Sequence, residues 1–312
     1  MNKVPFIKFN NGLKCPIFGL GTWKSNPGEV TQVVKDAIDI GYRHFDCAFI
    51  YENEKEIGKG IKEKLDEGVV KREDLFITSK LWNTKHEKEK VLPAIKASLK
   101  DLGLDYLDLY LVHWPFAFQE IPGNIWAKDE KGHWLTSDVD FTETWKGMEE
   151  CVDNGLAKSI GVSNFNTKQI QAVLDIARIK PVNNQIECYP YLNQKKLIDF
   201  CHAHDISVTS YGPLGRPFMD NSLQLLDDPV LMQISAKYNK SPAQVALRYQ
   251  VQRNVIVIPK TITKSRLHEN FNIFDFNIST EDMKSIDELD RNKRLVTFSE
   301  LSKHKHYPFL ED

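Results

Sequence analysis

Four polar side chains in this sequence stand at or just beyond the ends of short apolar runs. They are Asp46 in the run 44–47, Lys80 at the end of 74–80, His113 at the end of 106–113, and Tyr51, which follows the first of these runs. Runs of this length are typical of buried parallel strands, which carry apolar groups on both faces. Because the ends of parallel strands gather on one side of a sheet, we expect the four side chains to share one active-site face.

Side chains of these types could together deliver a proton to a carbonyl oxygen. An ammonium beside a phenol stabilises the phenolate, so Lys80, paired with Asp46, is expected to lower the pKa of Tyr51 towards neutrality and make it a general acid. His113 could donate a hydrogen bond to the oxygen on which negative charge develops during reduction. Without the tyrosine and the histidine, the other two residues would fit an ordinary structural salt bridge, and a lone histidine at a strand end is more often structural.

An apolar run followed by an amphipathic stretch repeats along the chain and would position these groups. Strands are predicted at 17–21, 44–47, 74–80, 106–113, 158–163, 182–188, 206–211 and 255–259. Helices are predicted at 28–40, 53–66, 87–102, 141–154, 167–177, 193–204, 229–239 and 264–271. Repeated units of this kind indicate an α/β fold, a closed (β/α)8 TIM barrel.

Several segments depart from the repeat. Residues 6–9, followed by Asn-Asn-Gly, predict a β-hairpin that caps one end of the barrel. Two extra helices are expected at 241–252 and 279–289, and a tail at 290–312 should cover the active-site face. The connection 114–140 is long and rich in large aromatic residues, so it should wall an apolar pocket.

The composition fits a single domain over residues 1–312. Hydrophobic residues make up 41% of the chain and the formal net charge is -2, so nothing favours a nucleic-acid or membrane partner. The five cysteines are scattered and form no CxxC pair, which argues against a disulfide framework or a metal site. Neither a secretion signal nor a stretch of transmembrane length is evident. We expect a cytoplasmic, monomeric protein that acts on a small molecule without a metal.

Seven short motifs, in this order and spacing, resemble those of the aldo-keto reductase family. They read GLGTW at 19–23, FDCA at 45–48, YENE at 51–54, KLW at 80–82, VHWP at 112–115, GVSNF at 161–165 and IPKT at 258–261. The resemblance covers nearly the whole chain. Within the family, the sequence resembles aldose and aldehyde reductases and insect reductases of 3-dehydroecdysone. It implies a barrel that binds a nicotinamide cofactor without a Rossmann domain. In agreement with this, Gly19 and Gly21 are not followed by the third glycine of a GxGxxG fingerprint.

The resemblance also implies a role for each of the four strand-end residues. Tyr51 would be the proton donor, Lys80 and Asp46 would tune its acidity, and His113 would orient the carbonyl group. The function expected on this basis is the NADPH-dependent reduction of aldehydes and ketones to alcohols. Two alternatives remain open: a catalytically quiet NADP(H)-binding barrel, and an isomerase or aldolase that uses Lys80 as a Schiff base.

The same comparison with the family implies where NADPH or NADP+ would bind. Residues expected at the nicotinamide are Ser163, Asn164 and Gln185 for the carboxamide, with Tyr211 stacked on the ring. Residues expected at the adenosine end are Lys260, Thr261 and Arg266 for the 2′-phosphate, with Glu269 and Asn270 for the adenine. Further cofactor positions are Gly21, Thr22, Trp23, Lys24, Asp46, Gly212 and Leu214. Two cations and a hydroxyl suit a phosphate dianion that NADH lacks, so NADPH is the expected cofactor.

Residues expected to wall the substrate favour a carbonyl compound with an apolar or flat body, such as a steroid or a lipid-derived aldehyde. They are Trp23, Phe49, Tyr51, Trp82, His113, Trp114, Phe118, Phe218, Val296 and Phe298. Val296 and Phe298 differ from the residues of aldose reductases, so a preference for sugar aldehydes is not implied. The loop at 212–218 is shorter than its counterpart in aldose reductases and lacks an aspartate. We therefore expect Arg216 to contact the cofactor phosphates and Lys24 to neutralise them.

Overall fold

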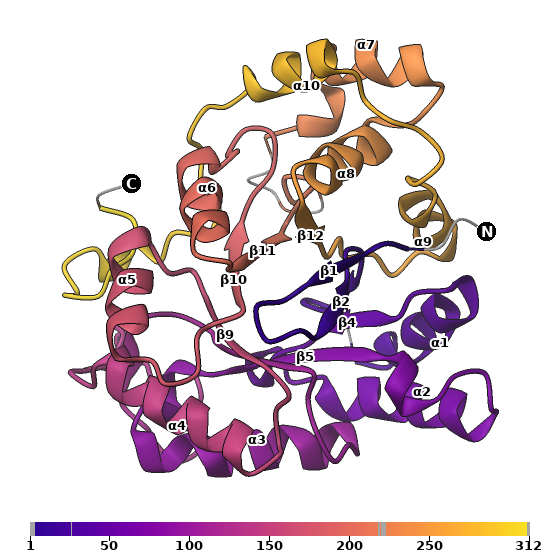
Figure 1. Cartoon of the computed structure of the whole chain (residues 1–312). Helices are drawn as coiled ribbons and strands as arrows, with labels where there is room; N and C mark the ends of the chain where they lie inside the picture. Colours follow the sequence, from indigo (N-terminus) through magenta and orange to yellow (C-terminus); the bar gives the residue numbers. More distant parts are fainter. Residues whose placement is uncertain (1–3, 26, 218, 220–222, 311–312) are drawn as a thin grey trace.

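Eight parallel strands form the centre of the computed structural model, which describes residues 4–25, 27–217, 219 and 223–310. The strands are β3 (Leu20–Gly21), β4 (His44–Asp46), β5 (Phe76–Leu81), β6 (Leu109–Val112), β9 (Ile160–Ser163), β10 (Asn183–Glu187), β11 (Ser207–Tyr211) and β12 (Val255–Val257). They pair in chain order, and bridges from Phe18 to Val257 and from Gly21 to Lys260 join the first strand to the last. The predicted parallel barrel is thus confirmed (Figure 1).

Helices follow the strands and cover the outside of the barrel (Figure 1). They are α1 (Val30–Ile40), α2 (Glu54–Asp66), α3 (Lys88–Leu102), α4 (Phe141–Asp153), α5 (Thr167–Ile176), α6 (Lys195–Ala203), α7 (Pro229–Tyr238), α8 (Pro242–Gln252), α9 (Lys264–Phe271) and α10 (Thr280–Asp287). Side chains of Asp140, Asn166, Asp228, Ser241 and Ser279 cap five of them by accepting backbone N–H groups. In the part of the chain that the structure describes, no helix has the length and apolarity needed to cross a bilayer.

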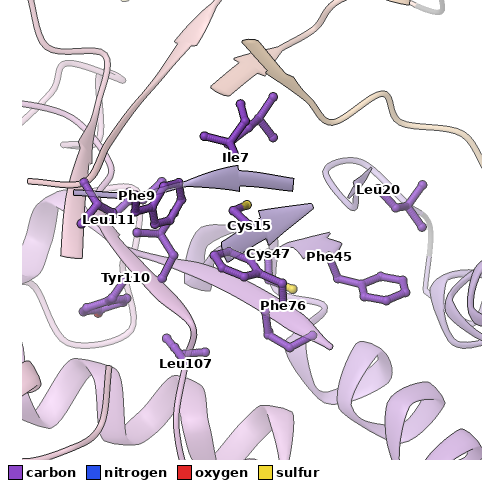
Figure 2. Close-up of a cluster of buried hydrophobic side chains, with 14 of the residues drawn as sticks. Ile7, Phe9, Cys15, Leu20, Phe45, Cys47, Phe76, Leu107, Tyr110 and Leu111 are labelled. Carbon is purple, nitrogen blue, oxygen red and sulfur yellow. The ribbon is translucent and has the colours of Figure 1, made fainter. Parts of the chain in front are cut away.

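A hairpin closes the end of the barrel at which the strands begin. Strands β1 (Phe6–Lys8) and β2 (Lys14–Pro16) pair antiparallel, as the turn sequence predicts. Asn11 Nδ2 donates to Ser159 Oγ at 2.8 Å and Asn10 Nδ2 to the carbonyl of Pro181 at 2.9 Å, just before β9 and β10. Phe9 packs edge-on against Phe76, inside the apolar cluster of Figure 2. The hairpin therefore covers this end of the barrel.

The structure is more ordered between β6 and α4 than the sequence indicates. A short antiparallel pair, β7 (Ala117–Phe118) with β8 (Thr136–Ser137), lies inside the connection expected to be an irregular loop. Its aromatic residues form one apolar cluster with Trp82, Leu301 and the tail residues Phe298 and Phe309. The predicted strand 106–113 is shorter than expected: only Leu109–Val112 join the sheet, and Leu107 makes an isolated bridge. His113 consequently lies just beyond the strand.

Candidate active site

A buried ammonium group connects three of the four predicted catalytic residues. Lys80, on β5, is 0% exposed, and its Nζ donates to Asp46 Oδ2 at 2.7 Å, to the carbonyl of Cys47 at 2.9 Å and to the hydroxyl of Tyr51 at 3.3 Å. Asp46 ends β4, and Tyr51 ends the 3-10 helix η1 (Phe49–Tyr51) that follows it. A lysine ammonium has three N–H donors, so these acceptors satisfy all of them.

The charge state of this group follows from its neighbours. Burial opposes the charge on Lys80, but the combined effect of Asp46 and Tyr51 is larger and raises the pKa of the ammonium. A lysine that stays protonated has no lone pair for attack on a carbonyl carbon. The geometry therefore gives no support to a Schiff-base role for Lys80.

The acidity expected for Tyr51 needs correction. Burial raises the pKa of this phenol, and the opposing effect of Lys80 is too small to reverse the shift. The negative charge of Asp46, which partly cancels that of the lysine at the phenol, adds to the increase. Tyr51 is therefore not poised near neutrality in this structure. It is fully protonated at neutral pH, the state in which it can donate a proton.

His113 lies beside the phenol as a neutral ring. Its centroid is 5.9 Å from that of Tyr51 and 5.4 Å from that of Trp82. Burial and the nearby Lys80 charge lower the pKa of the imidazole well below its usual range. Its Nδ1 has no hydrogen-bond partner among the described residues. A neutral ring retains one N–H, which suits it to orient a carbonyl oxygen.

A chain of amide and hydroxyl groups joins the tetrad to the predicted nicotinamide residues. Gln185 Nε2 donates to Asp46 Oδ1 at 2.7 Å, and Ser163 Oγ donates to the carbonyl of Gln185 at 2.8 Å. Asn164 Nδ2 donates to the carbonyl of His113 at 3.0 Å, while the Tyr211 hydroxyl donates to Asn164 Oδ1 at 2.8 Å. A row of amides ending in an aromatic ring has the donors, acceptors and flat surface that a nicotinamide needs. The residues present therefore fit such a cofactor.

One cavity, at the end where the strands finish, brings most of the predicted residues together. Its lining includes Gly21, Thr22, Trp23, Asp46, Tyr51, Trp82, His113, Trp114, Ser163, Asn164, Gln185, Tyr211, Gly212, Leu214, Lys260, Val296 and Phe298. Lys80 lies beneath this surface, and predicted positions outside the lining are Lys24, Phe49, Phe118, Thr261, Arg266, Glu269 and Asn270. Phe118 packs behind Trp82, with 5.9 Å between ring centroids, so it backs the wall without forming it. Phe218, which was predicted to wall the substrate, lies outside the described residues.

Of the predicted adenosine residues, Lys260 lines the cavity, and the others follow it in sequence outside the lining. Lys260 follows β12 and lines the cavity, and Thr261 Oγ1 accepts the backbone N–H of Thr263 at 3.1 Å, just before α9. Burial lowers the pKa of the Lys260 ammonium, and Glu29 only partly opposes this. Glu269, on α9, accepts from Ser241 Oγ at 2.5 Å. An anion beside Lys260 would offset the cost of burying its charge.

Some residues of the cavity were absent from the predicted site. They are Ile50, Trp126, Pro213, Pro217, Ile258 and Pro259. Ile50 precedes Tyr51, and Ile258 and Pro259 belong to the IPKT motif, so proximity to predicted residues could have identified them. Trp126 belongs to the aromatic connection 114–140, which was expected to wall a pocket, but nothing local in the sequence singles it out there. It is 45% exposed, and its ring lies 5.9 Å from that of Trp82.

The short loop after β11 places a cation inside the cavity. Arg216 is 8% exposed, and its guanidinium lies 4.3 Å from the centroid of the Trp23 ring. Lys24 Nζ lies 4.9 Å from the same ring and 3.6 Å from Met219 Sδ. Burial lowers the pKa of the Arg216 guanidinium, and Glu187 partly offsets this. Both predicted phosphate contacts therefore lie around one indole.

Known proteins resemble this chain in sequence and fold over nearly its full length. The family model described as "Aldo/keto reductase family" matches residues 17–291. Aldo-keto reductase family 1 member A1-A of Danio rerio is 46% identical, over 98% of both chains, and prostaglandin F synthase 2 of Bos taurus is 46% identical, also over 98% of both chains. The human aldo-keto reductase family 1 member A1 is 48% identical over 93% of this chain and 90% of its own. The solved aldose reductase of Schistosoma japonicum superposes with a TM-score of 0.94, at 46% identity and 99% coverage of each chain. On this evidence the chain belongs to the aldo/keto reductase family, whose members are oxidoreductases that act on carbonyl compounds.

Proposed function

We propose that this protein reduces aldehydes and ketones to alcohols with NADPH, and that Tyr51 supplies the proton. The observation that supports this most directly is the buried Lys80 ammonium in contact with both Asp46 and the Tyr51 hydroxyl. Bound NADPH would supply the hydride. The neutral His113 ring donates a hydrogen bond to the substrate oxygen and holds it near the phenol. Tyr51 then gives its proton to that oxygen as negative charge develops there.

The raised pKa of Tyr51 is compatible with this role. A phenol that remains protonated in the free site keeps its proton until a strong base, the developing alkoxide, appears beside it. The phenolate that remains is stabilised by Lys80, which donates to its oxygen across 3.3 Å and stays charged because of Asp46. The amide of Gln185 holds the other oxygen of that carboxylate. The Asp46–Lys80 ion pair therefore stabilises the phenolate that proton transfer leaves on Tyr51.

Two finer features belong to the same proposal. We assign NADPH as the preferred cofactor because Lys260, Thr261 and Arg266 provide cations and a hydroxyl for a 2′-phosphate. We assign apolar carbonyl substrates, steroid-like or lipid-derived, because Trp82, Trp114 and Phe298 present rings to the cavity. Relatives of similar identity carry names as different as prostaglandin F synthase and aldose reductase, so the choice rests on the walls. We also propose a single-domain monomer, located in the cytoplasm, where its five free, buried cysteines would stay reduced.

The test measures NADPH oxidation by absorbance with 4-nitrobenzaldehyde. We expect turnover in the wild type and almost none in Tyr51→Phe, because the variant keeps the ring but has no proton to give. NADPH affinity, followed by fluorescence quenching, should stay close to that of the wild type. Tyr106→Phe is the matched control: the same hydroxyl is removed from a ring that stacks with Arg72 and Lys158, away from the cavity.

The outcomes separate the alternatives. NADPH binding without turnover in the wild type would favour a quiet cofactor-binding barrel. Full turnover in Tyr51→Phe would remove this tyrosine from the mechanism while leaving the reductase assignment intact. Trapping of the substrate on Lys80 by borohydride would favour the Schiff-base enzyme.

A further inference from the structure

The carboxylate of Glu187 is buried at the end of β10 and contacts the tail rather than the barrel. Glu187 is 0% exposed. Its Oε2 accepts the backbone N–H of Leu295 and of Val296, each at 3.0 Å, and its Oε1 accepts that of Leu295 at 3.1 Å. The tail has no regular secondary structure at these residues, so its amides need acceptors from elsewhere. Glu187 provides them from a rigid strand end.

Burying the Glu187 carboxylate costs free energy, which its neighbours partly offset. Burial raises the pKa of Glu187, which shows that the surroundings oppose its ionised form. The two tail amides and the cations Arg294 and Arg216 act against that rise. Arg294 belongs to the tail and Arg216 to the loop after β11. The carboxylate therefore interacts with two segments, each of which contributes a residue to the cavity lining.

The tail segment held by Glu187 carries a wall of the cavity. Val296 lines the cavity directly, as does Phe298 two residues later. The Phe298 ring packs 4.8 Å from Trp114 and 5.3 Å from Trp134, so its position sets how closely the tail approaches the loop. A backbone fixed at Val296 leaves these side chains little freedom to retreat.

A second anchor lies farther back along the tail. The Tyr189 hydroxyl donates to the carbonyl of Lys293 at 2.6 Å, and the carbonyl of Tyr191 accepts the N–H groups of Arg291 and Lys293 at 3.1 Å each. Residues 187–191 thus hold residues 291–296. Of these contacts, only the hydrogen bond from Val296 to Glu187 involves a residue of the cavity wall.

We propose that Glu187 is a positioning residue that sets substrate selectivity, because its carboxylate fixes the Val296–Phe298 wall over the catalytic tyrosine. This inference rests on the proposed function, since it assigns that wall to the substrate. A large apolar carbonyl compound would touch the wall and benefit from its rigidity. A small aldehyde would bind near Tyr51 and His113 without reaching it. Loosening the tail should therefore penalise the large substrate and spare the small one.

The experiment compares 2-naphthaldehyde with propanal in the wild type, Glu187→Gln and Glu187→Asp. Glutamine has the same shape but no charge, and its amide nitrogen cannot replace Oε1 as an acceptor for the Leu295 N–H, so a single neutral oxygen must serve both tail amides. We expect Glu187→Gln to raise the KM for 2-naphthaldehyde about tenfold with kcat nearly unchanged, while kcat/KM for propanal stays within about twofold. Glu187→Asp should recover part of the loss because the charge is retained. Tyr189→Phe, which removes one hydrogen bond of the more distant anchor, should leave the ratio of the two substrates close to that of the wild type.

Amide hydrogen exchange gives a readout that does not depend on activity. The N–H groups of Leu295 and Val296 should exchange faster in Glu187→Gln, and exchange in the barrel strands should be unaltered. Equal losses of kcat/KM for both aldehydes, or unchanged exchange in the tail, would overturn the assignment of Glu187. Absence of turnover with either aldehyde in the wild type would instead contradict the proposed function.

Discussion

At the scale of single residues, the Asp46–Lys80 pair buries two opposite charges in the site. Both side chains are removed from water, at 3% and 0% exposure, and desolvation of each ion must be offset by the other. Removing one member leaves an uncompensated buried charge. Removing both leaves only a packing change. The stability of the barrel and the proposed chemistry therefore both depend on the contact between Lys80 Nζ and Asp46 Oδ2.

Asp46→Asn should lower the free energy of unfolding by about 3–5 kcal/mol, the usual cost of breaking a buried pair from one side. Adding Lys80→Met to this variant should restore part of that loss, because the unpaired ammonium is gone. Urea unfolding measures both. Asp66→Asn serves as the control, since the Lys62–Asp66 pair is 73% and 63% exposed and its loss should change little. A double variant as unstable as the single one would contradict this account.

The sequence predicts the position of these residues better than their electrostatics. Strand-end positions follow from the apolar runs, and the structure places Asp46, Tyr51, Lys80 and His113 around one cavity or just beneath it. The pKa of Tyr51 was predicted in the wrong direction. The interpretation counted the ammonium beside the phenol but not its burial, which depends on the loop and the tail that cover the site.

At the scale of elements, the segment from β12 to α9 is the proposed support for the adenosine phosphate. Lys260→Ala and Arg266→Ala should each weaken NADPH binding by about ten- to a hundredfold, since a charge-assisted hydrogen bond is worth about 1.5–3 kcal/mol. NADH binding should hardly change. Fluorescence titration with both cofactors measures this.

A neighbour on the same helix provides the control for this prediction. Lys264 is 62% exposed, and its Nζ lies 2.9 Å from Asp36 Oδ1, so its charge already has a partner outside the cavity. Lys264→Ala should leave both affinities unchanged. Matching losses of NADPH and NADH affinity in the Lys260 or Arg266 variant would remove the 2′-phosphate from the proposal.

Regular elements were predictable because their periodicity is local, whereas the additions depend on contacts distant in sequence. Helix α3 was predicted at 87–102 and observed at Lys88–Leu102, and α8 was predicted at 241–252 and observed at Pro242–Gln252. The β7–β8 pair has only two residues in each strand, too few for an alternating pattern to show. The exposure of Trp126 beside Trp82 likewise arises from folding of the long loop.

At the scale of the whole molecule, buried histidines make the fold sensitive to acid. Burial lowers the pKa of His44 to about 4, with Asp46 partly opposing the shift. Burial, followed by the charges of His306 and His304, lowers the pKa of His86 to about 3. Both rings stay neutral in the folded protein but take up protons in the unfolded chain below about pH 6.5. The unfolded state therefore binds more protons, and stability falls as the pH drops from about 6.5.

Each of these histidines should cost about 1.4 kcal/mol per pH unit inside that window. We expect His86→Met to show a shallower loss of unfolding free energy between pH 6.5 and 4 than the wild type. Neither His86 ring nitrogen has a hydrogen-bond partner among the described residues, so the substitution removes no such bond. His268→Met, at an exposed position on α9, is the control. Parallel pH curves for wild type and His86→Met would show that this ring does not carry the effect.

The hairpin end and the tail also place the two ends of the described chain in different surroundings. The carbonyl of Pro5 accepts the N–H of Ile17 at 2.9 Å, near the end where the barrel strands begin. Phe309 lies 5.9 Å from Trp114 and under the guanidinium of Arg294, beside the substrate walls. A purification tag or fusion partner at the amino end would be attached near the end of the barrel that the hairpin covers. The same addition at the carboxyl end would begin beside the aromatic cluster that borders the cavity, so the amino end is the safer position for immobilising or labelling this enzyme.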